Sequence, residues 1–485
     1  MQSGNPLLDH LFRRVGFGAS AADLQAVAGL SYSAAVDYFV DFEKQPDDVD
    51  SKIGLAEYVS VTSRGQFAPS TNIEDARQRW LFRMVHTRRP LQEKMALFWH
   101  NHFGVGYSKV AGTVGAVGGT KMMANKSGDT PGPPGHYELL RQMALSKFRD
   151  LLVAVAEDPA MLWFLDGRTN TSTRPQENFG REVMELFTWG LGHYVEADVY
   201  AAARVFTGWN VQSVPGNRQE AAAYQEFVYL SAAHDTTAKT FTFPINGGSN
   251  IIPARSAGAG MQDGLELLMS LANHPDTARR LAGKLWNFFV SELEVPDPAF
   301  IEAVTEVYLR GDTDMRAVLR YILNSRWFTD PGNFNARYSW PVEYVVRTIK
   351  EIGWNGFSVD SARVALNEMG QTLFEPPNVA GWQLGRAWFG TGQMLARMNF
   401  AAMLASNQKF NLARGFSAAE RAQPDGVLDG MLRRMTPAPF AANETTELLD
   451  YLTAGGPWTG SDTQMSAKAP GIARLIAGSG EYQLV

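Results

Sequence analysis

The chain has 485 residues, of which 45% are hydrophobic and 19% charged, and its formal net charge is −6. This composition is typical of a globular protein with a substantial core, and the negative balance argues against a nucleic-acid-binding protein, which would carry a basic stripe. The lack of cysteine excludes disulfides, thiolate metal sites and cysteine nucleophiles, and no run of eighteen apolar residues is present to span a membrane.

The N-terminal part of the chain is predicted to be helical. Residues 7–40 are predicted to form helices. The first stops at Gly16, and Ser20 caps the second. Residues 74–103 have an amphipathic pattern that Pro90 interrupts, and the pattern ends in the sequence WHNHFG.

Residues 104–136 have a different composition, rich in Gly, Ser, Thr and Pro. A segment of this kind buries too little apolar surface to be held rigidly, so we predict a mobile glycine-rich loop. The helical period resumes at residues 137–157, and a further loop, residues 158–176, leads to the next helix.

Residues 177–190, ENFGREVMELFTWG, mix carboxylates with large apolar side chains in one predicted helix. Glu182 and Glu185 are three residues apart, so both project from neighbouring turns of one face. Glu177 and Arg181 form an i, i+4 pair with the acid first, which is the favourable order. Charged groups among apolar residues must be paired or have shifted pKa values. They are therefore either ordinary surface ion pairs or part of a functional site.

The rest of the chain is predicted to be helical apart from one short β region. Residues 198–209 form a helix, and residues 210–258 contain the strand-like pieces EFVYL and KTFTFPI. Helical periods return from residue 264, and residues 411–485 form a C-terminal helical tail. No repeat and no clear linker divides residues 1–485, so we predict a single large, mostly α domain. It is either a helical bundle or an α/α toroid-like assembly with a small β excursion near residues 210–258.

Two histidines beside the glycine-rich segment offer a first candidate site. His100 and His102 are two residues apart, and at a helix end such a pair can converge on one metal ion, with central-helix carboxylates as further ligands. No recognised ligand spacing supports a metal. The alternative is that the histidines hydrogen-bond to Glu182 or Glu185. The cofactor is thus unknown, with none favoured and a divalent metal as the alternative.

Acid–base chemistry needs two groups whose environments separate their pKa values. Glu182 and Glu185 are the leading pair, because like charges on adjacent turns raise the pKa of one of them. Asp166 and Asp235 are loop carboxylates placed where a substrate can approach, although Asp166 equally suits a turn. His234, next to Asp235, either orients a ligand or caps a turn.

Three further residues complete the candidate set. Arg204 lies in an alanine-rich helix and is expected to pair with Glu182 or Glu185, and Trp209 follows in the same helix. Trp382 is either a platform for a sugar ring or an anchor of its loop. The candidate catalytic residues are therefore Glu182, Glu185, Asp235 and Asp166. The candidate substrate-binding residues are Arg181, Glu177, His100, His102, Arg204, His234, Trp209 and Trp382.

Several stretches of the chain resemble one bacterial protein family. They are HLFRRVGFG at 10–18, EKMALFWHNHF at 93–103, ENFGREVMELFTWGLG at 177–192, DVYAAARVFTGW at 198–209, HD at 234–235, KLWNFFV at 284–290 and PPNVAGW at 376–382. The family is the domain of unknown function numbered 1800, and the resemblance covers nearly the whole chain. It implies a periplasmic or secreted protein after signal removal, with a sulfatase-like neighbour protein as a partner. It implies no reaction.

From the residues we predict an exported hydrolase with a carboxylate-lined cleft, acting by general acid–base catalysis on a glycan or related polar polymer. The clustered carboxylates, the abundant tryptophan and the glycine-rich segment support this hypothesis. One alternative is a metal-dependent enzyme that uses His100 and His102 with central-helix glutamates. The other is a non-enzymatic structural or secretion-partner protein whose polar residues form a buried network. The expected ligand is a glycan or a polar small molecule.

Overall fold

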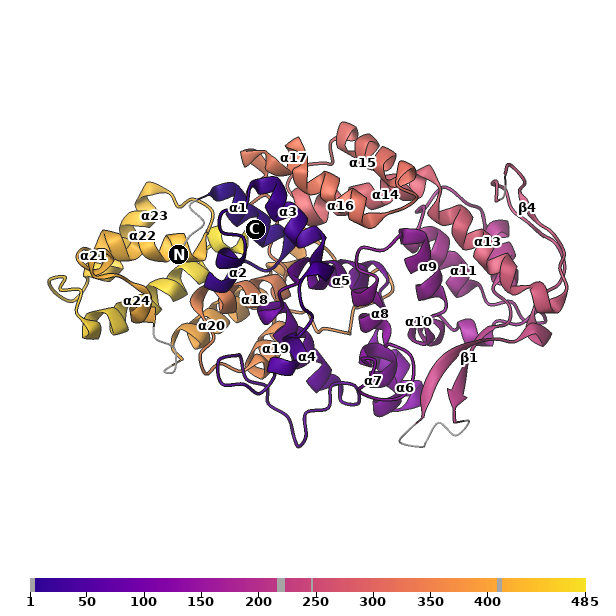
Figure 1. Ribbon diagram of the computed structural model, residues 1–485, viewed down its shortest axis with the longest axis horizontal. Helices are drawn as coiled ribbons and strands as arrows, with labels where there is room; N and C mark the ends of the chain where they lie inside the picture. The colour runs from indigo at the N-terminus through magenta and orange to yellow at the C-terminus, as the bar shows by residue number, and fades with distance from the viewer. Residues whose placement is uncertain (1–4, 216–222, 246, 408–411) are drawn as a thin grey trace.

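Helices form most of the protein in the computed structural model, which describes residues 5–215, 223–245, 247–407 and 412–485 (Figure 1). The described β structure is limited to two two-stranded sheets. This confirms the predicted mostly α fold with a small β region. None of the helices in these described ranges is long and apolar enough to cross a membrane.

The first helices begin and end where the local sequence signals indicate. α1 begins after Asn5, whose side chain caps it, and ends at Gly16. Ser20 and Asp23 form a capping box at the start of α2. Pro90 opens α5 at a position where its missing N–H leaves no hydrogen bond unmade. The elements of this region are α1 (Pro6–Val15), α2 (Ala21–Ala26), α3 (Tyr32–Val40), η1 (Phe42–Lys44), η2 (Val49–Lys52), α4 (Ile73–His86) and α5 (Pro90–His102).

Residues 104–136 do not form one long loop, so that prediction is wrong. They contain α6 (Tyr107–Val114) and α7 (Ala116–Ala124), which contact each other closely. A Cβ atom at Gly119 would lie 2.7 Å from the Cα of Ala111, so the missing side chain lets the two helices approach. The glycines of this segment therefore serve packing as well as turns. The mobility of the segment stays a prediction, which amide hydrogen exchange can test.

The predicted central helix is present and ends in an unusual turn. α11 (Glu177–Glu182) runs directly into a π-helical turn, η4 (Val183–Phe187). The predicted loop at residues 158–176 is wrong in part, because Asp158 caps a short helix there and Pro159 opens it. The neighbouring elements are α8 (His136–Gln142), α9 (Phe148–Ala156), α10 (Pro159–Phe164), η3 (Gly167–Thr169) and α12 (Glu196–Val205).

The β region consists of two small antiparallel sheets. In the first, Trp209 pairs with Tyr229 and Val214 with Tyr224. Trp209 therefore opens a strand, and the predicted helix over residues 198–209 ends earlier, at Val205. The elements are β1 (Trp209–Val214), β2 (Tyr224–Tyr229), η5 (Ser231–Ala233), β3 (Lys239–Thr240), β4 (Ile251–Ile252) and η6 (Ala257–Ala259).

The second half of the chain is helical, as predicted. A second π-helical turn, η7, extends α14. The elements before the tail are α13 (Met261–Ala272), α14 (Pro275–Leu285), η7 (Trp286–Val290), α15 (Pro298–Arg310), α16 (Met315–Asn324), α17 (Arg326–Thr329), η8 (Pro331–Asn333), α18 (Pro341–Ile352), α19 (Val359–Glu368), η9 (Gly385–Trp388) and α20 (Thr391–Ala405). The tail contains η10 (Leu412–Gly415), α21 (Ala418–Arg421), α22 (Pro424–Met435), α23 (Ala442–Thr453), α24 (Asp462–Gly478) and η11 (Glu481–Gln483).

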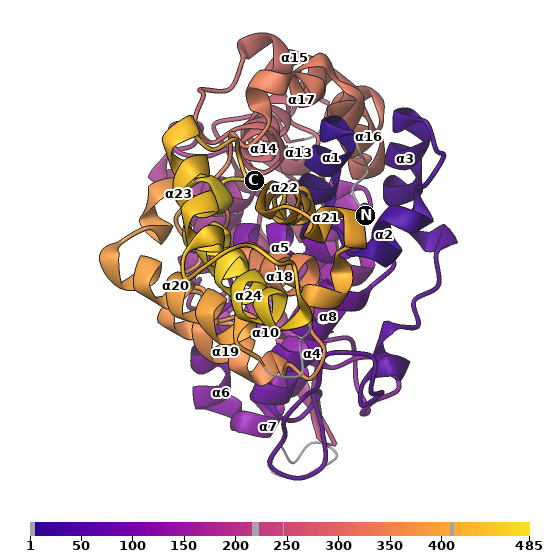
Figure 2. The same cartoon turned by 90° about the vertical axis from the view of Figure 1, so that its left-hand side faces the viewer.

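The core lies around α4, α5 and α18, near the middle of the molecule in Figure 1. Almost every residue of α5 and α18 is buried, so the polar residues of these helices must find partners inside the protein. Glu343 of α18 accordingly forms ion pairs with Lys94 of α5 and with Arg337. The C-terminal tail lies at one end of the molecule in Figure 1, and Figure 2, which faces that end, shows the tail beside α1 and α2.

Candidate functional site

Three segments far apart in the sequence meet at the C-terminal end of α5. The Nε2 atom of His102 lies 3.1 Å from the backbone oxygen of Phe187, and its Nδ1 atom lies 2.9 Å from the Nζ atom of Lys284. A carbonyl oxygen only accepts hydrogen bonds, so Nε2 carries the proton and donates it. The Nδ1 atom is then the acceptor, and the Lys284 amine donates to it. His102 is thus a neutral imidazole that holds the amine by one N–H.

Both partners of His102 lie at π-helical turns. Phe187 is the last residue of η4, and Lys284 stands two residues before η7. A π-turn shifts the helical hydrogen-bond pattern by one residue and leaves backbone groups for other partners, and such turns are frequent at functional sites. The carbonyl of Phe187 accepts its hydrogen bond from His102 at such a turn.

A cavity of about 130 Å³ lies beside the Lys284 amine. Four aromatic rings form its walls, and the exposed residues Ala380 and Leu384 form its rim. Asn101 fastens the rim loop to α5, because its Oδ1 atom accepts a hydrogen bond of 2.6 Å from the backbone N–H of Trp382. The lining residues are Phe98, Asn101, His102, Lys284, Phe288, Trp340, Ala380, Trp382 and Leu384.

Lys284 has no ordinary counterion. Among the described residues no carboxylate lies within ion-pair distance of its amine, and its hydrogen-bond partner is the neutral His102. Burial, and then the positive charge of Arg280, lower the pKa of Lys284 to about 7. Burial also holds the pKa of His102 well below its usual value. A large fraction of Lys284 is therefore an uncharged amine at neutral pH, the form that acts as a nucleophile or base.

The stretches that build this site belong to one protein family. Residues 10–484 match the family described as "Protein of unknown function (DUF1800)". The chain belongs to the DUF1800 family. No curated protein and no solved structure matches it. The cavity combines residues of EKMALFWHNHF, KLWNFFV and PPNVAGW, and Phe187 belongs to ENFGREVMELFTWGLG. Four of the stretches that carry the family resemblance therefore converge on His102 and Lys284.

The depressed pKa of Lys284 has a consequence for the stability of this DUF1800 protein. The unfolded chain holds the lysine proton up to about pH 10.5, whereas the folded protein releases it near pH 7. Between these values the unfolded state binds more protons, so stability attributable to Lys284 rises with pH. Relative to Lys284→Met, the wild type is expected to gain roughly 2–4 kcal/mol between pH 6 and pH 10. Urea unfolding measures the free energy of unfolding of both proteins at each pH. If their difference stays constant between pH 6 and pH 10, the lowered pKa of Lys284 is contradicted.

The carboxylates of the central helix lie apart from this cavity. Glu182 is partly buried and has no hydrogen-bond or ion-pair partner among the described residues. Burial, and then the charge of Glu185, raise the pKa of Glu182, in the direction that the sequence predicts. Glu185 accepts a hydrogen bond from the Tyr194 hydroxyl. Arg181 pairs with Glu177 at 3.4 Å, as predicted, and also with Glu196.

His100 does not join His102 in a site. α5 continues through both residues, and two positions along an α-helix point about 200° apart. His100 is fully buried, both of its nitrogens lack a described partner, and burial lowers its pKa to about 3. Neither histidine hydrogen-bonds to Glu182 or Glu185, so both predicted arrangements are wrong. No group of three potential metal ligands occurs among the residues placed in the structure.

Arg204 and its neighbours form contacts that hold the β region. Arg204 pairs with Asp235 at 2.7 Å and not with Glu182 or Glu185, so the predicted pairing is wrong. The ring of His234 lies 2.8 Å from the Thr207 backbone oxygen through Nδ1 and 3.3 Å from Asp263 through Nε2. Helix α12 places Arg204 on the side that faces Asp235. The local sequence around Arg204 does not reveal which segment packs against that side.

The remaining candidate residues, Asp166, Trp209 and Trp382, lie at a turn or are buried. Asp166 has a φ of +60° at a turn and lies 3.2 Å from the Lys109 amine. Trp209 and Trp382 are 1% and 5% exposed, so neither offers an open face on which a sugar ring can stack. Trp382 nevertheless lines the cavity beside Lys284. Of the predicted substrate-binding residues, His102 and Trp382 are therefore the two that line the cavity beside Lys284.

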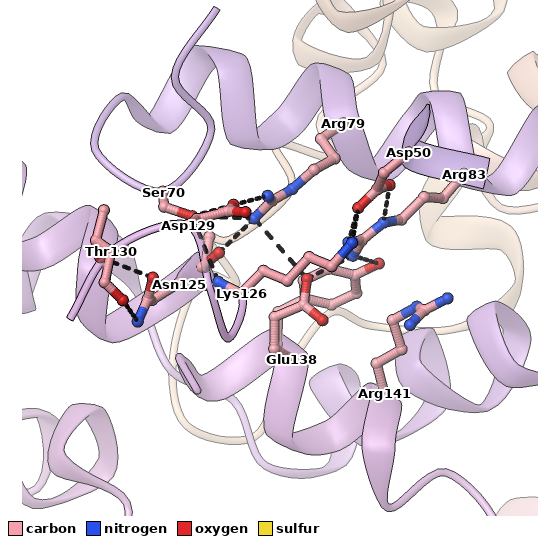
Figure 3. Close-up of polar contacts among 12 residues, drawn as sticks. Asp50, Ser70, Arg79, Arg83, Asn125, Lys126, Asp129, Thr130, Glu138 and Arg141 are labelled. Carbon is pink, nitrogen blue, oxygen red and sulfur yellow. Dashed lines mark hydrogen bonds and ion pairs between the residues drawn. The ribbon is translucent and has the colours of Figure 1, made fainter. Parts of the chain in front are cut away.

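A dense network of charges that the sequence analysis missed links α4 to α8 (Figure 3). Arg83 donates to Asp50 and Glu138, Arg79 pairs with Asp129, and Lys126 also donates to Asp50. A cavity of about 420 Å³ opens beside this network, but every charged group that lines it has a partner. The charges that line this cavity are therefore compensated within the protein.

Lys284 and Asn101 are candidate site residues that sequence reasoning missed. The available signal was a lysine directly before an apolar run, in KLWNFFV, and an asparagine between the two histidines of WHNHF. Neither signal is specific. The feature that marks Lys284 as a candidate is that its amine has no described carboxylate partner. That feature depends on which segments of the chain surround the amine.

Proposed function

We propose that the protein is an enzyme in which the Lys284 amine forms an imine with a small carbonyl substrate. The observation that carries the proposal is a partly buried lysine that has a neutral histidine, and no described carboxylate, as its partner at a small aromatic cavity. Nucleophilic lysines are activated in this way, by an apolar pocket or a neighbouring cation, and Arg280 supplies the cation here.

The cavity sets the class of substrate. Its volume of about 130 Å³ is close to that of a cavity that holds one benzene molecule, on the order of 150 Å³. The walls are aromatic, so a short uncharged aldehyde or ketone fits better than a sugar polymer. The side-chain amide of Asn101 has no described acceptor for its N–H groups and lies at the cavity, where it can donate to a carbonyl oxygen.

The residues have separate roles in the reaction. His102 accepts one N–H of Lys284 and so turns the lone pair of the uncharged amine toward the cavity. The Nζ atom bonds to the carbonyl carbon, the π electrons move to the oxygen, and an amine proton ends on that oxygen. Loss of water from this adduct leaves a C=N bond to Lys284, so one carbonyl and one amine give one imine and one water. Asn101 stabilises the charge that develops on the oxygen.

Borohydride trapping tests the proposal. The protein is incubated with propanal or butanone at pH 7 and reduced with sodium borohydride, and the modified lysines are identified by peptide mass spectrometry. Lys284 is expected to be modified at least about tenfold faster than Lys109, whose side chain is 49% exposed and pairs with Asp166. Lys284→Met should remove the fast adduct, and Lys109→Met should not. Equal modification of the two lysines would overturn the proposal.

A second candidate function is the hydrolase that acts on a glycan through the central-helix carboxylates. The observation in its favour is the raised pKa of Glu182, which is partly buried beside Glu185 and lacks a described partner. Under this hypothesis Glu182 is the general acid. Glu182→Gln should then keep its melting temperature within about 2 °C and abolish release of reducing sugar from an oligosaccharide panel. Absence of any such release by the wild type would reject the hydrolase.

A further inference from the structure

A third cavity lies between the N-terminal helices and the tail. Its volume is about 290 Å³, and α1, α2, α18, η10 and α22 contribute to its walls. Figure 2 shows α21 and α22 beside α1 and α2 at this end of the molecule. The walls combine apolar side chains, such as Phe12 and Phe416, with four cationic ones, Arg13, Lys350, Arg433 and Arg434.

Two of these cations are already neutralised. Lys350 pairs with Asp23 at 2.9 Å, and Arg433 pairs with Glu420 at 2.7 Å. Glu351, which also lines the cavity, is engaged by Arg347 at 3.0 Å. The carboxylates of these pairs are thus committed to other groups.

Arg13 has no such partner among the described residues. It is 5% exposed, and its guanidinium makes no hydrogen bond and no ion pair within the described part of the chain. Its Nε atom is buried without a partner, and Asp9 and Glu351 offset its charge only at longer range. Burial, and then the charge of Arg347, lower the pKa of Arg13 to about 10, so it is still a cation at neutral pH. A buried cation without a partner is costly, and a bound anion would remove that cost.

Arg434 faces the same space from α22. Its Nε and Nη2 atoms donate to the backbone oxygens of Glu351 and Ile352, and it has no carboxylate partner among the residues described. A Cβ atom at residue 415 would lie 2.8 Å from its Nη1 atom, so the missing side chain of Gly415 makes room for this guanidinium. Two guanidinium groups from opposite ends of the chain therefore present unused donors to one cavity.

We propose that this cavity binds a small phosphate monoester, whose phosphate group is held between Arg13 and Arg434. The guanidinium of Arg13 and the Nη1 atom of Arg434 can donate to the oxygens of a phosphate, and its charge of nearly −2 balances the two cations. A volume of about 290 Å³ leaves room for an organic group against Phe12 and Phe416. This site is independent of the imine chemistry at Lys284.

Calorimetry on the full chain, with glycerol 3-phosphate and with inorganic phosphate as probes, tests this site. The wild type is expected to bind the monoester, and Arg13→Met and Arg434→Met should each weaken binding by at least about tenfold. Arg433→Met is the matched control, because that guanidinium is 45% exposed and already paired with Glu420, and it should change binding by less than about threefold.

Stability measurements and further variants distinguish a phosphate site from a purely structural role of the two arginines. Without ligand, Arg13→Met should be as stable as the wild type or more stable, since it removes a buried unpaired cation. If that variant fails to fold, Arg434→Lys, which keeps the charge but loses the fork, should still weaken monoester binding. The proposal would be overturned if neither phosphate binds at about 10 mM, the limit for a weak site. Binding of succinate, a dicarboxylate without phosphate, in place of both phosphates would also overturn it. So would unchanged monoester binding in both arginine variants.

Discussion

Replacing Glu343 with glutamine is expected to lower the free energy of unfolding by about 3–5 kcal/mol at pH 7. Glu343 is 2% exposed and lies among Lys94 and Arg337, both of them fully buried. Its Oε1 and Oε2 atoms accept hydrogen bonds of 2.8 and 2.9 Å from Arg337. Removing the negative charge leaves buried Lys94 without a counterion and Arg337 with only Glu292, at 3.9 Å, which is the costly case for an internal ion pair.

The pH dependence of that loss identifies its cause. Burial raises the pKa of Glu343, but Arg337 and Lys94 outweigh burial and lower it to about 2, below the ordinary value of 4.5. The stability that the carboxylate contributes is therefore complete above about pH 4.5 and is lost as pH falls toward 2. Urea unfolding at several pH values should show the wild type and Glu343→Gln converging in acid.

An exposed pair provides the control for this variant. Glu306 pairs with Arg310 on the surface of α15, with side chains that are 56% and 79% exposed. Solvent screens such a pair, so Glu306→Gln should change the free energy of unfolding by less than about 0.5 kcal/mol. A loss in Glu343→Gln no larger than that of Glu306→Gln would show that the buried cluster contributes nothing to stability.

Replacing Gly381 with alanine is expected to displace the rim loop of the Lys284 cavity and to cost roughly 2–4 kcal/mol. Gly381 has a φ of +83°, and a Cβ atom there would lie 2.2 Å from the backbone oxygen of Asn101. The loop would have to move away from α5 and break the hydrogen bond between Trp382 and Asn101. Unfolding experiments measure the cost, and the rate of borohydride trapping at Lys284 reports the displacement.

Gly370→Ala separates backbone strain from the steric clash. Gly370 has a similar φ of +89°, but nothing lies within 4 Å of the position of its Cβ atom. This variant therefore meets only the strain of the left-handed conformation, about 1–2 kcal/mol, and should leave trapping at Lys284 unchanged. If both alanine variants have the same stability and the same trapping rate, the close approach of Gly381 to Asn101 has no energetic role.

Local patterns predicted much of this fold. The stop at Gly16, the cap at Ser20, the interruption at Pro90 and the helix that begins at Glu177 all rest on interactions within about four residues. The raised pKa of Glu182 has the same origin in part, because Glu185 is its neighbour along the helix. The prediction of a long loop at residues 104–136 was wrong for a local reason as well. Glycine content alone does not distinguish a flexible turn from a close contact between two helices.

The candidate sites depend on contacts between distant segments. Lys284 and His102 are 182 residues apart, and Arg204 finds its carboxylate 31 residues later in Asp235 instead of on the neighbouring helix. Whether a lysine or an arginine is desolvated without a counterion is set by every segment packed around it, and periodicity carries no information about those segments. The sequence by itself therefore determined the family, the mostly α fold and the helix ends that local caps, glycine and proline set. Only the tertiary structure decided that Lys284 is buried beside a neutral histidine, with no carboxylate partner among the described residues.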